Sequence, residues 1–189
     1  MKVRLVGCLA VALTVGLAAS ARAGDDAAVV RLKIFLKVAT YDGRFPGDAR
    51  TLKLGLLFPA AGNREPGLAA TRAAVVSLSS LRVRGLDFQV IELPYSDLSH
   101  MEADLTNAGV YGVVIAEATS HADVEVLSDI LVRLHLMSFA EDPGALDHGA
   151  AAAVEIIDNR PRIVVNTVAT QACGHELASS LLALARLLK

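Results

Sequence analysis

Apolar and polar positions along the chain follow two kinds of pattern. Short runs that are mostly apolar, or that alternate with a period of two, are typical of β-strands. They occupy residues 51–58, 87–93, 111–118 and 135–140. Between them, apolar residues recur three and four positions apart, which places them on one face of a helix. This helical pattern covers residues 25–39, 67–81, 99–109 and the segment that begins at 120.

The alternation of strands and helices predicts an α/β fold with a mostly parallel sheet flanked by helices. Residues 111–118 are apolar enough for a central strand that is buried on both faces. After Pro143 the pattern changes: two β-rich runs surround Asp158 and Asn159, which predicts an antiparallel hairpin over 149–166. A stripe then follows at helical spacing and predicts a last helix that docks on the sheet. The stripe consists of Leu177, Leu181, Leu184, Ala185 and Leu188.

Capping residues predict where one helix begins and ends and where the next one begins. Ser99 and Glu102 have the spacing of a capping box, and Gly109 would end the helix that they begin. Thr119 or Ser120 is placed to cap the next helix.

The N-terminus has the composition of a secretory signal. Lys2 and Arg4 precede an apolar run over 5–19, and Ala21-Arg22-Ala23 matches the A-x-A pattern of a cleavage site. The run is short for a membrane span, which needs about 20 apolar residues. We therefore expect cleavage after Ala23, export to the periplasm, and a single domain over 24–189.

The charge and the cysteine content argue against nucleic-acid binding and against an intramolecular disulfide. The full chain has a net charge of −2, and cleavage after Ala23 would remove three basic residues and no acidic one. This is not the basic footprint of a nucleic-acid-binding protein. Cys8 would leave with the signal, so Cys173 would have no partner for an intramolecular disulfide.

The C-terminal segment contains residues that could do chemistry. Cys173 and His175 could pair as nucleophile and base, but residues two apart on a helix point in different directions. His175-Glu176 begins like a zinc-protease motif, yet Ser179 stands where the second histidine is needed. Ser180 likewise has no nucleophile-elbow context. We expect a buried, inert cysteine, solvated serines, no catalytic residue and no metal site here.

Two loops contain residues that resemble ligand-binding motifs. The stretch from Gly62 to Gly67 has the glycine spacing of a phosphate loop, but Leu68 and Ala69 replace the lysine and the hydroxyl residue. A second loop contains acidic residues and a histidine, without the regular spacing of metal ligands. These residues are Glu141, Asp142, Asp147 and His148. We expect a solvated loop and no cofactor.

The end of the strand at 111–118 contains candidate ligand-binding residues. In open parallel sheets, ligands lie outside the carboxyl ends of the strands. Glu117, Thr119 and Ser120 follow the most apolar strand, so they are candidate binding residues, although the last two are also natural helix caps.

The last third of the chain resembles the closing signature of the YfiR-like periplasmic proteins. An asparagine ends the hairpin, an alanine follows three residues later and a glycine eight residues later, and serines and leucines complete the pattern. These positions are Asn166, Ala169, Gly174, Leu177, Ser179, Ser180, Leu181, Leu182, Leu184 and Ala185. Upstream elements appear in the family's order, but this chain has no tryptophan and lacks the paired cysteines of many members.

The resemblance implies a non-enzymatic repressor that binds the periplasmic sensor region of a membrane-anchored signalling protein, a diguanylate cyclase. Binding of the inactive conformer would lower cyclic di-GMP and biofilm output. We expect the exposed side of the first helix, with Arg31, Lys33 and Lys37, to meet an acidic partner; a homodimer is a further candidate assembly.

Two other functions stay open from the residues alone. A periplasmic solute-binding protein would use the crevice at Glu117. A hydrolase would need Ser77 or Ser138 brought to His100 or His148.

Overall fold

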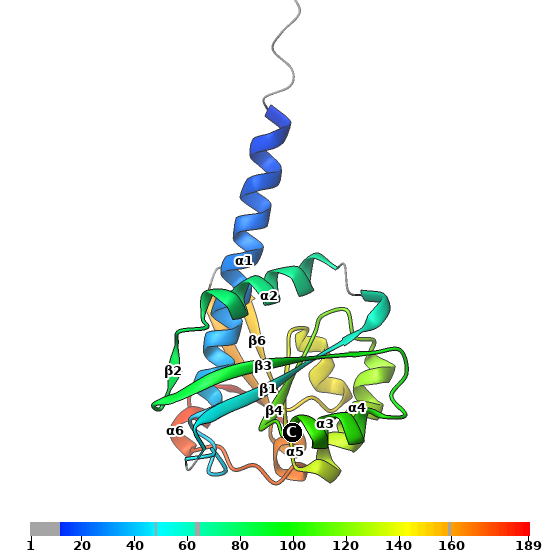
Figure 1. The fold of residues 1–189 in the computed structure, drawn as a ribbon. Coiled ribbons are helices and arrows are strands. Elements are labelled where there is room, and N and C mark those ends of the chain that lie inside the picture. The colour runs from blue at the N-terminus through cyan, green and yellow to red at the C-terminus, as the bar shows by residue number, and fades with distance from the viewer. Residues whose placement is uncertain (1–11, 48, 63–64, 159) are drawn as a thin grey trace, which may run out of the picture.

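The fold was analysed in a computed structural model, which describes residues 12–47, 49–62, 65–158 and 160–189. Helices and strands alternate over most of this length (Figure 1). The helices are α1 (Ala12–Ala39), α2 (Pro66–Ser77), α3 (Met101–Ala108), α4 (His121–Leu134), α5 (Thr167–Ala172) and α6 (Ser179–Leu182), with short 3-10 turns η1 (Ala60–Gly62) and η2 (Pro143–His148). The strands are β1 (Thr51–Pro59), β2 (Arg82–Val83), β3 (Leu86–Tyr95), β4 (Gly112–Ile115), β5 (Met137–Ala140), β6 (Ala152–Ile157), β7 (Arg160–Asn166) and β8 (Arg186–Leu188).

The described strands form one sheet in the order β2-β3-β1-β4-β5-β6-β7-β8. The pairs from β3 to β6 are parallel, while the β2–β3 and β6–β7 pairs are antiparallel. This confirms the predicted α/β class, the mostly parallel sheet and the hairpin over 149–166. At the hairpin turn, Asp158 takes a positive φ of 49°, a conformation that aspartate tolerates better than most residues.

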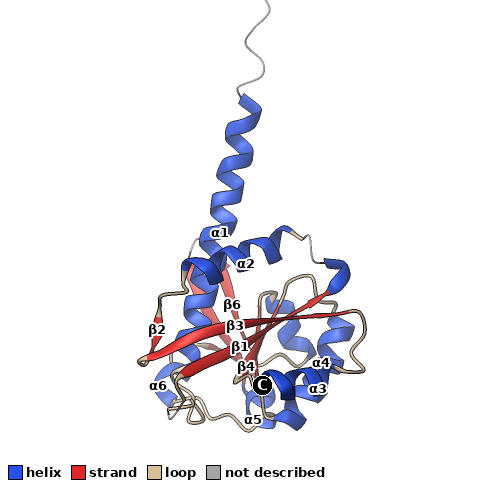
Figure 2. Cartoon of the chain, in the orientation of Figure 1, coloured by secondary structure: helices blue, strands red, loops and turns tan. Residues whose placement is uncertain are grey.

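Helices cover both faces of the sheet, as Figure 2 shows for α1 and α2 on one side and α3 and α4 on the other. Alternate strand residues point to opposite faces. Leu54 and Leu56 of β1 therefore pack in the core under α1 and α2, whereas Leu57 packs in the core under α3 and α4. Because both faces are covered, the central strands are apolar throughout: β4 and β5 are buried along their whole length.

Helix α4 begins where the sequence predicted, and α3 does not. The Ser120 side chain caps α4 by accepting a hydrogen bond from the Asp123 N–H at 3.1 Å. The capping box at Ser99 is wrong, because the Ser99 hydroxyl donates to Asp97 instead and α3 starts after His100. The end of α3 at Gly109, with φ of 59°, is confirmed.

The last segment is not the single docking helix that the leucine stripe predicted. Residues 177–188 form the four-residue α6 and then strand β8, which pairs in parallel with β7. Of the stripe, Leu181 is buried at 3% exposure, whereas Leu184 is 78% exposed. The prediction was wrong because β7 would otherwise be an edge strand, and pairing with β8 satisfies its backbone groups.

Helix α1 includes the predicted cleavage site at 21–23, and the beginning of the predicted signal lies outside the described residues. Within the part that the structure describes, no helix is both long and apolar enough to cross a membrane. Export and cleavage after Ala23 remain predictions.

Candidate functional site

The chain changes direction across the sheet at β1. Strand β3, which follows β1 in sequence, lies on one side of it, and β4 lies on the other. In open α/β sheets, ligands bind outside the carboxyl ends of the strands at such a switch point. The predicted residues Glu117, Thr119 and Ser120 lie at this edge, just after β4.

Glu141 directly follows β5 at the same edge and is 5% exposed. Its carboxylate accepts hydrogen bonds from the Thr71 hydroxyl of α2 and, at 3.2 Å, from the backbone N–H of Glu117. Burial raises the pKa of Glu141; the two hydrogen bonds and the positive charge of Arg31 only partly oppose this effect. The protonated form of this carboxyl is therefore favoured more than that of a solvated glutamate.

Glu117 is exposed, and its side chain reaches towards the start of α2. A Cβ atom at Gly67 would lie 3.4 Å from the Glu117 Oε2 atom, which places this carboxylate beside the first turn of α2. Two carboxylates, one buried and one exposed, therefore lie beside the N-terminal turn of α2.

Thr119 and Ser120 have local roles. Thr119 is buried next to the Tyr95 hydroxyl, and burial raises the pKa of Tyr95 to about 12. Ser120 is the cap of α4, so its hydroxyl is engaged with the backbone. Glu117 is thus the predicted binding residue whose side chain is open to a ligand.

The three basic residues expected on one face of α1 divide between two places. Arg31 is half-buried and close enough to Glu141 to lower that residue's pKa, so it belongs to the crevice. Lys33 and Lys37 are exposed and line a groove between α1 and the β2–β3 turn. No single docking face with all three is formed.

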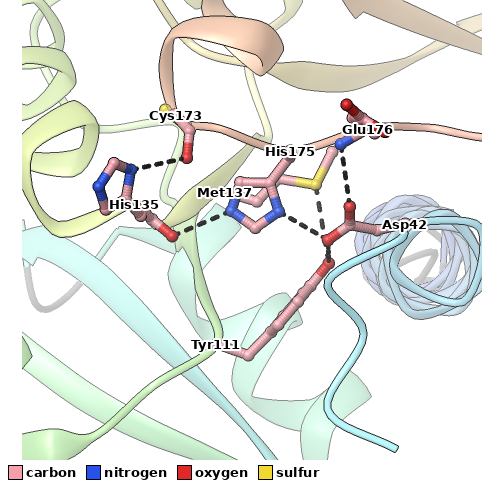
Figure 3. A network of polar contacts seen from close by, with 7 residues as sticks. All are labelled: Asp42, Tyr111, His135, Met137, Cys173, His175 and Glu176. Atoms are coloured by element: carbon pink, nitrogen blue, oxygen red, sulfur yellow. Dashed lines mark hydrogen bonds and ion pairs between the residues drawn. The ribbon is translucent and has the colours of Figure 1, made fainter.

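A second polar cluster lies in the interior, near the amino-terminal ends of the strands (Figure 3). Asp42 follows α1, Tyr111 precedes β4, and His175 comes from the loop after α5. The Asp42 Oδ2 atom lies 2.6 Å from both His175 Nδ1 and the Tyr111 hydroxyl, and Oδ1 accepts from the Glu176 N–H at 3.2 Å. The side chains of Asp42 and His175 are 0% and 2% exposed.

This cluster ties three distant segments together. Burial alone would raise the pKa of Asp42, but hydrogen bonds from His175, Tyr111 and the Arg44 backbone outweigh it, and the net pKa is lowered. The second ring nitrogen of His175 lies 3.0 Å from the His135 carbonyl oxygen, which can only accept. Both ring nitrogens are therefore engaged, one by the Asp42 carboxylate and the other by the His135 carbonyl oxygen, and neither faces a nucleophile.

The remaining candidates of the C-terminal segment are placed as expected. Cys173 is buried, and burial raises the pKa of its thiol to about 11, so it is a poor nucleophile. Ser179 and Ser180 are exposed.

The acidic loop after β5 was expected to be solvated, and this is true only in part. Asp147 is exposed, and His148 Nδ1 lies 2.7 Å from Glu125 at the surface. Asp142 caps η2 and lies 3.0 Å from His121 Nε2, while Glu141 is buried. Within residues 12–47, 49–62, 65–158 and 160–189, no group of three or more potential ligands is arranged to hold a metal ion.

The hydrolase pairs are not assembled. Ser138 is buried and accepts a hydrogen bond from the Ala151 N–H, and Ser77 donates to the Ala74 carbonyl. His148 pairs with a carboxylate instead of either serine.

Sequence reasoning missed three important residues. Asp42 looked like part of a turn, Thr71 like an ordinary helix position, and Glu141 like a loop acid. For Glu141 a signal existed: it follows a short apolar strand, as Glu117 does, and parallel neighbours place their carboxyl ends together. For Asp42 there was none, since its partner His175 is 133 residues away.

Comparison with known proteins shows the fold. Neither a protein-family profile nor a curated protein matches the sequence. Three solved structures are similar. The ABC domain in complex with L-Trp from Streptococcus pneumonia has a TM-score of 0.56 and 11% identity, and the match covers 85% of this chain and 62% of that one. A substrate-binding protein with adhesive properties from Clostridium difficile, in its ligand-free, open form, has a TM-score of 0.55 and 14% identity, with coverages of 73% and 54%; a conserved domain protein from Vibrio cholerae has a TM-score of 0.54 and 11% identity, with coverages of 72% and 54%.

At these identities the similarity establishes a shared fold. This chain spans between 54% and 62% of the length of those three structures. The fold is thus one that a substrate-binding protein and a tryptophan-bound domain also use.

Proposed function

We propose that this chain is an exported binding protein for a small solute, held in the crevice at the carboxyl ends of β4 and β5. The observation that carries the proposal is the pair of carboxylates, Glu117 and Glu141, placed together at the switch point beside the first turn of α2. The fold shared with a substrate-binding protein supports the same function.

The charges of the crevice favour a ligand with an amino group. The exposed Glu117 carboxylate would accept from an ammonium group, and charge-assisted hydrogen bonds of this kind are the strong ones. Arg31, whose positive charge acts on Glu141, would bind a carboxylate of the same ligand. Together they suit an amino-acid-like zwitterion, the class to which the L-Trp of the Streptococcus pneumonia domain belongs.

The chemistry of the described residues supports binding in place of catalysis. A hydrolase needs a nucleophile within hydrogen-bond reach of a base. Both nitrogens of the His175 ring are engaged by Asp42 and the His135 carbonyl oxygen, and the Cys173 thiol is buried with a raised pKa.

Isothermal titration of the purified chain with the common amino acids tests this function. We expect at least one to bind with a dissociation constant in the micromolar range, and Glu117→Gln to weaken it by about tenfold, as loss of one charge-assisted hydrogen bond does. Asp129→Asn, which removes an exposed carboxylate from α4, is the control and should bind as the wild type does.

Two results would contradict the proposal. One is that no amino acid binds up to millimolar concentration. The other is that Glu117→Gln and Asp129→Asn bind equally well, which would place the site elsewhere.

A second function has support from the C-terminal segment, where the resemblance to YfiR-like proteins is specific. Asn166 caps α5 by accepting from the Ala169 N–H at 2.9 Å, and its amide donates to the Leu146 carbonyl. Gly174 takes a φ of 76°, and Leu181 is buried. Four of the ten signature positions, Asn166, Ala169, Gly174 and Leu181, thus have a local structural role, which supports the regulator of a membrane-anchored diguanylate cyclase as the alternative.

Co-expression tests the alternative. If the chain is such a regulator, it should co-purify with the cyclase and lower its synthesis of cyclic di-GMP. An unchanged rate of synthesis in the presence of the chain would leave solute binding as the function.

A further inference from the structure

Four basic side chains gather around one groove on a chain that is acidic overall. The groove has a volume of about 390 Å³ and lies between the last turns of α1 and the turn that joins β2 to β3. Its basic residues are Lys33, Lys37, Arg82 and Arg84. Such a volume is in the range of roughly 300–1,000 Å³ that small-molecule sites occupy.

The groove lies near the opposite ends of the strands from Glu117 and Glu141. Strand β2 pairs with the first residues of β3, and these lie opposite Thr51, the first residue of β1. The groove therefore flanks the amino-terminal ends of β1 and β3, whereas Glu117 and Glu141 follow the carboxyl ends of β4 and β5. The two sites do not share a residue.

Little negative charge compensates the four cations. Arg82 forms an ion pair with Asp87 at 3.1 Å, but both side chains are more than two-thirds exposed, so the pair is weak. The Lys37 ammonium lies 5.1 Å from the centre of the Tyr41 ring, and the Arg84 guanidinium 5.4 Å from that of Phe45. Aromatic rings hold these two cations in place without neutralising them.

The conformation of Arg84 adds to this argument. Arg84 and Gly85 both have positive φ, at 50° and 87°, as the two central residues of a tight hairpin turn do. Asparagine or glycine fits the first of these positions with less strain than arginine. Residue 84 is nevertheless an arginine, and its guanidinium group lies over the Phe45 ring beside the groove.

We propose that this groove binds a small soluble molecule with at least two oxyanion groups, such as a phosphate ester or a polycarboxylate. The forked guanidinium groups bind oxyanions in a bidentate way, and the lysines add point charges. Leu81, also in the lining and 37% exposed, provides an apolar surface for the body of the ligand. The proposal is independent of solute binding at Glu117.

Titration with simple anions tests the proposal. In about 50 mM salt, where charges are weakly screened, inorganic pyrophosphate and citrate should bind the full chain with dissociation constants below about 1 mM, and acetate should not. The variant Lys33→Gln/Lys37→Gln/Arg84→Asn removes three charges, and asparagine suits the turn. We expect it to bind at least roughly tenfold more weakly.

The matched control removes charge elsewhere. Arg160 and Arg162 line a separate cavity at the β6–β7 hairpin, so Arg160→Gln/Arg162→Gln should stay within about twofold of the wild type. Thermal melting of all variants checks that they are folded. Glu117→Gln should bind pyrophosphate as the wild type does, which separates this site from the solute crevice.

Three results would overturn the proposal. The first is equal loss in the triple variant and the control, which would indicate non-specific attraction. The second is no binding of either multivalent anion. The third is binding to anionic phospholipid vesicles or to an acidic peptide alone, which would assign the groove to a macromolecular surface.

Discussion

Asp42 and His175 form a buried hydrogen-bonded pair whose polar side-chain atoms are all engaged. Removing a carboxylate and an imidazole from water is costly, and the cost is offset only when hydrogen bonds satisfy both groups. Here Tyr111, the Glu176 N–H and the His135 carbonyl supply them. The pair therefore fixes the position of the C-terminal segment against the end of α1, and loss of one partner leaves the other uncompensated.

We predict that His175→Ala destabilises the protein by about 3 kcal/mol, because it leaves the buried Asp42 carboxylate without one of its hydrogen-bond partners. Tyr111→Phe removes a single hydrogen bond to a charged group and should cost about 1.5–3 kcal/mol. Urea unfolding at pH 7 measures both. His100→Ala, at an exposed position, is the control. A cost for His175→Ala no greater than for this control would contradict the structural role.

The pH dependence of the pair follows from the direction of the Asp42 shift. Because the pKa of Asp42 is lower in the folded than in the unfolded chain, its contribution is present above the unfolded value of 3.8 and is lost as pH falls through the folded value. The stability difference between wild type and Asp42→Asn should therefore shrink below about pH 4. Thermal melts between pH 3 and pH 7 would show this, and a difference that is independent of pH would exclude it.

Glu141 should show the opposite dependence. Since burial raises its pKa above 4.5, the folded chain binds this proton more tightly than the unfolded chain does. Glu141 therefore reduces stability as pH rises from 4.5 through the folded value. Relative to Glu141→Gln, the wild type should lose stability over this window. A constant difference would mean that the carboxyl is not perturbed.

At the scale of the elements, the C-terminal segment shows how tertiary contacts override local preference. Residues 177–188 are rich in leucine and alanine, which favour helix, and their spacing fits one helical face. In the fold, only α6 is helical, and 186–188 join the sheet beside β7. Backbone pairing at the sheet edge is worth more than a few tenths of a kcal/mol per residue of helix propensity.

Substitution of two leucines from the predicted stripe distinguishes the observed arrangement, α6 followed by β8, from a continuous docking helix. Leu181→Ala should cost about 2–5 kcal/mol, because it leaves a cavity in the core. Leu184→Ala should change stability by less than about 0.5 kcal/mol, since this side chain is exposed. Chemical unfolding of the two variants gives the comparison. Equal, large costs would favour a continuous docking helix instead.

At the scale of the whole molecule, the core does not depend on the start of α1. Among the α1 residues whose burial the structure describes, Ala28 is the first that belongs to the core, followed by Leu32, Phe35 and Leu36. These four bury the helix under α2 and against the sheet. A cut after Ala23 would therefore leave every described core contact of α1 in place.

We predict that residues 24–189 fold alone with a melting temperature close to that of the same chain purified from an exporting cell, and that the exported chain begins at Gly24. Intact-mass spectrometry of the exported protein checks the cleavage site, and calorimetry checks the stability. A mass that retains residues 1–23 would contradict the signal sequence. A molten 24–189 fragment would show that earlier residues are needed for packing.

The sequence by itself determined the layered α/β architecture, because the apolar residues of most strands and helices recur with the period of that element, which is a local property. It also placed Glu117 at the carboxyl edge of a central strand. Only the tertiary structure decided the partners: that Glu141 joins Glu117, that Arg31 separates from Lys33 and Lys37, and that Asp42 meets His175. Such pairings depend on which strands lie side by side and on edge strands that need a neighbour, and no local pattern records either.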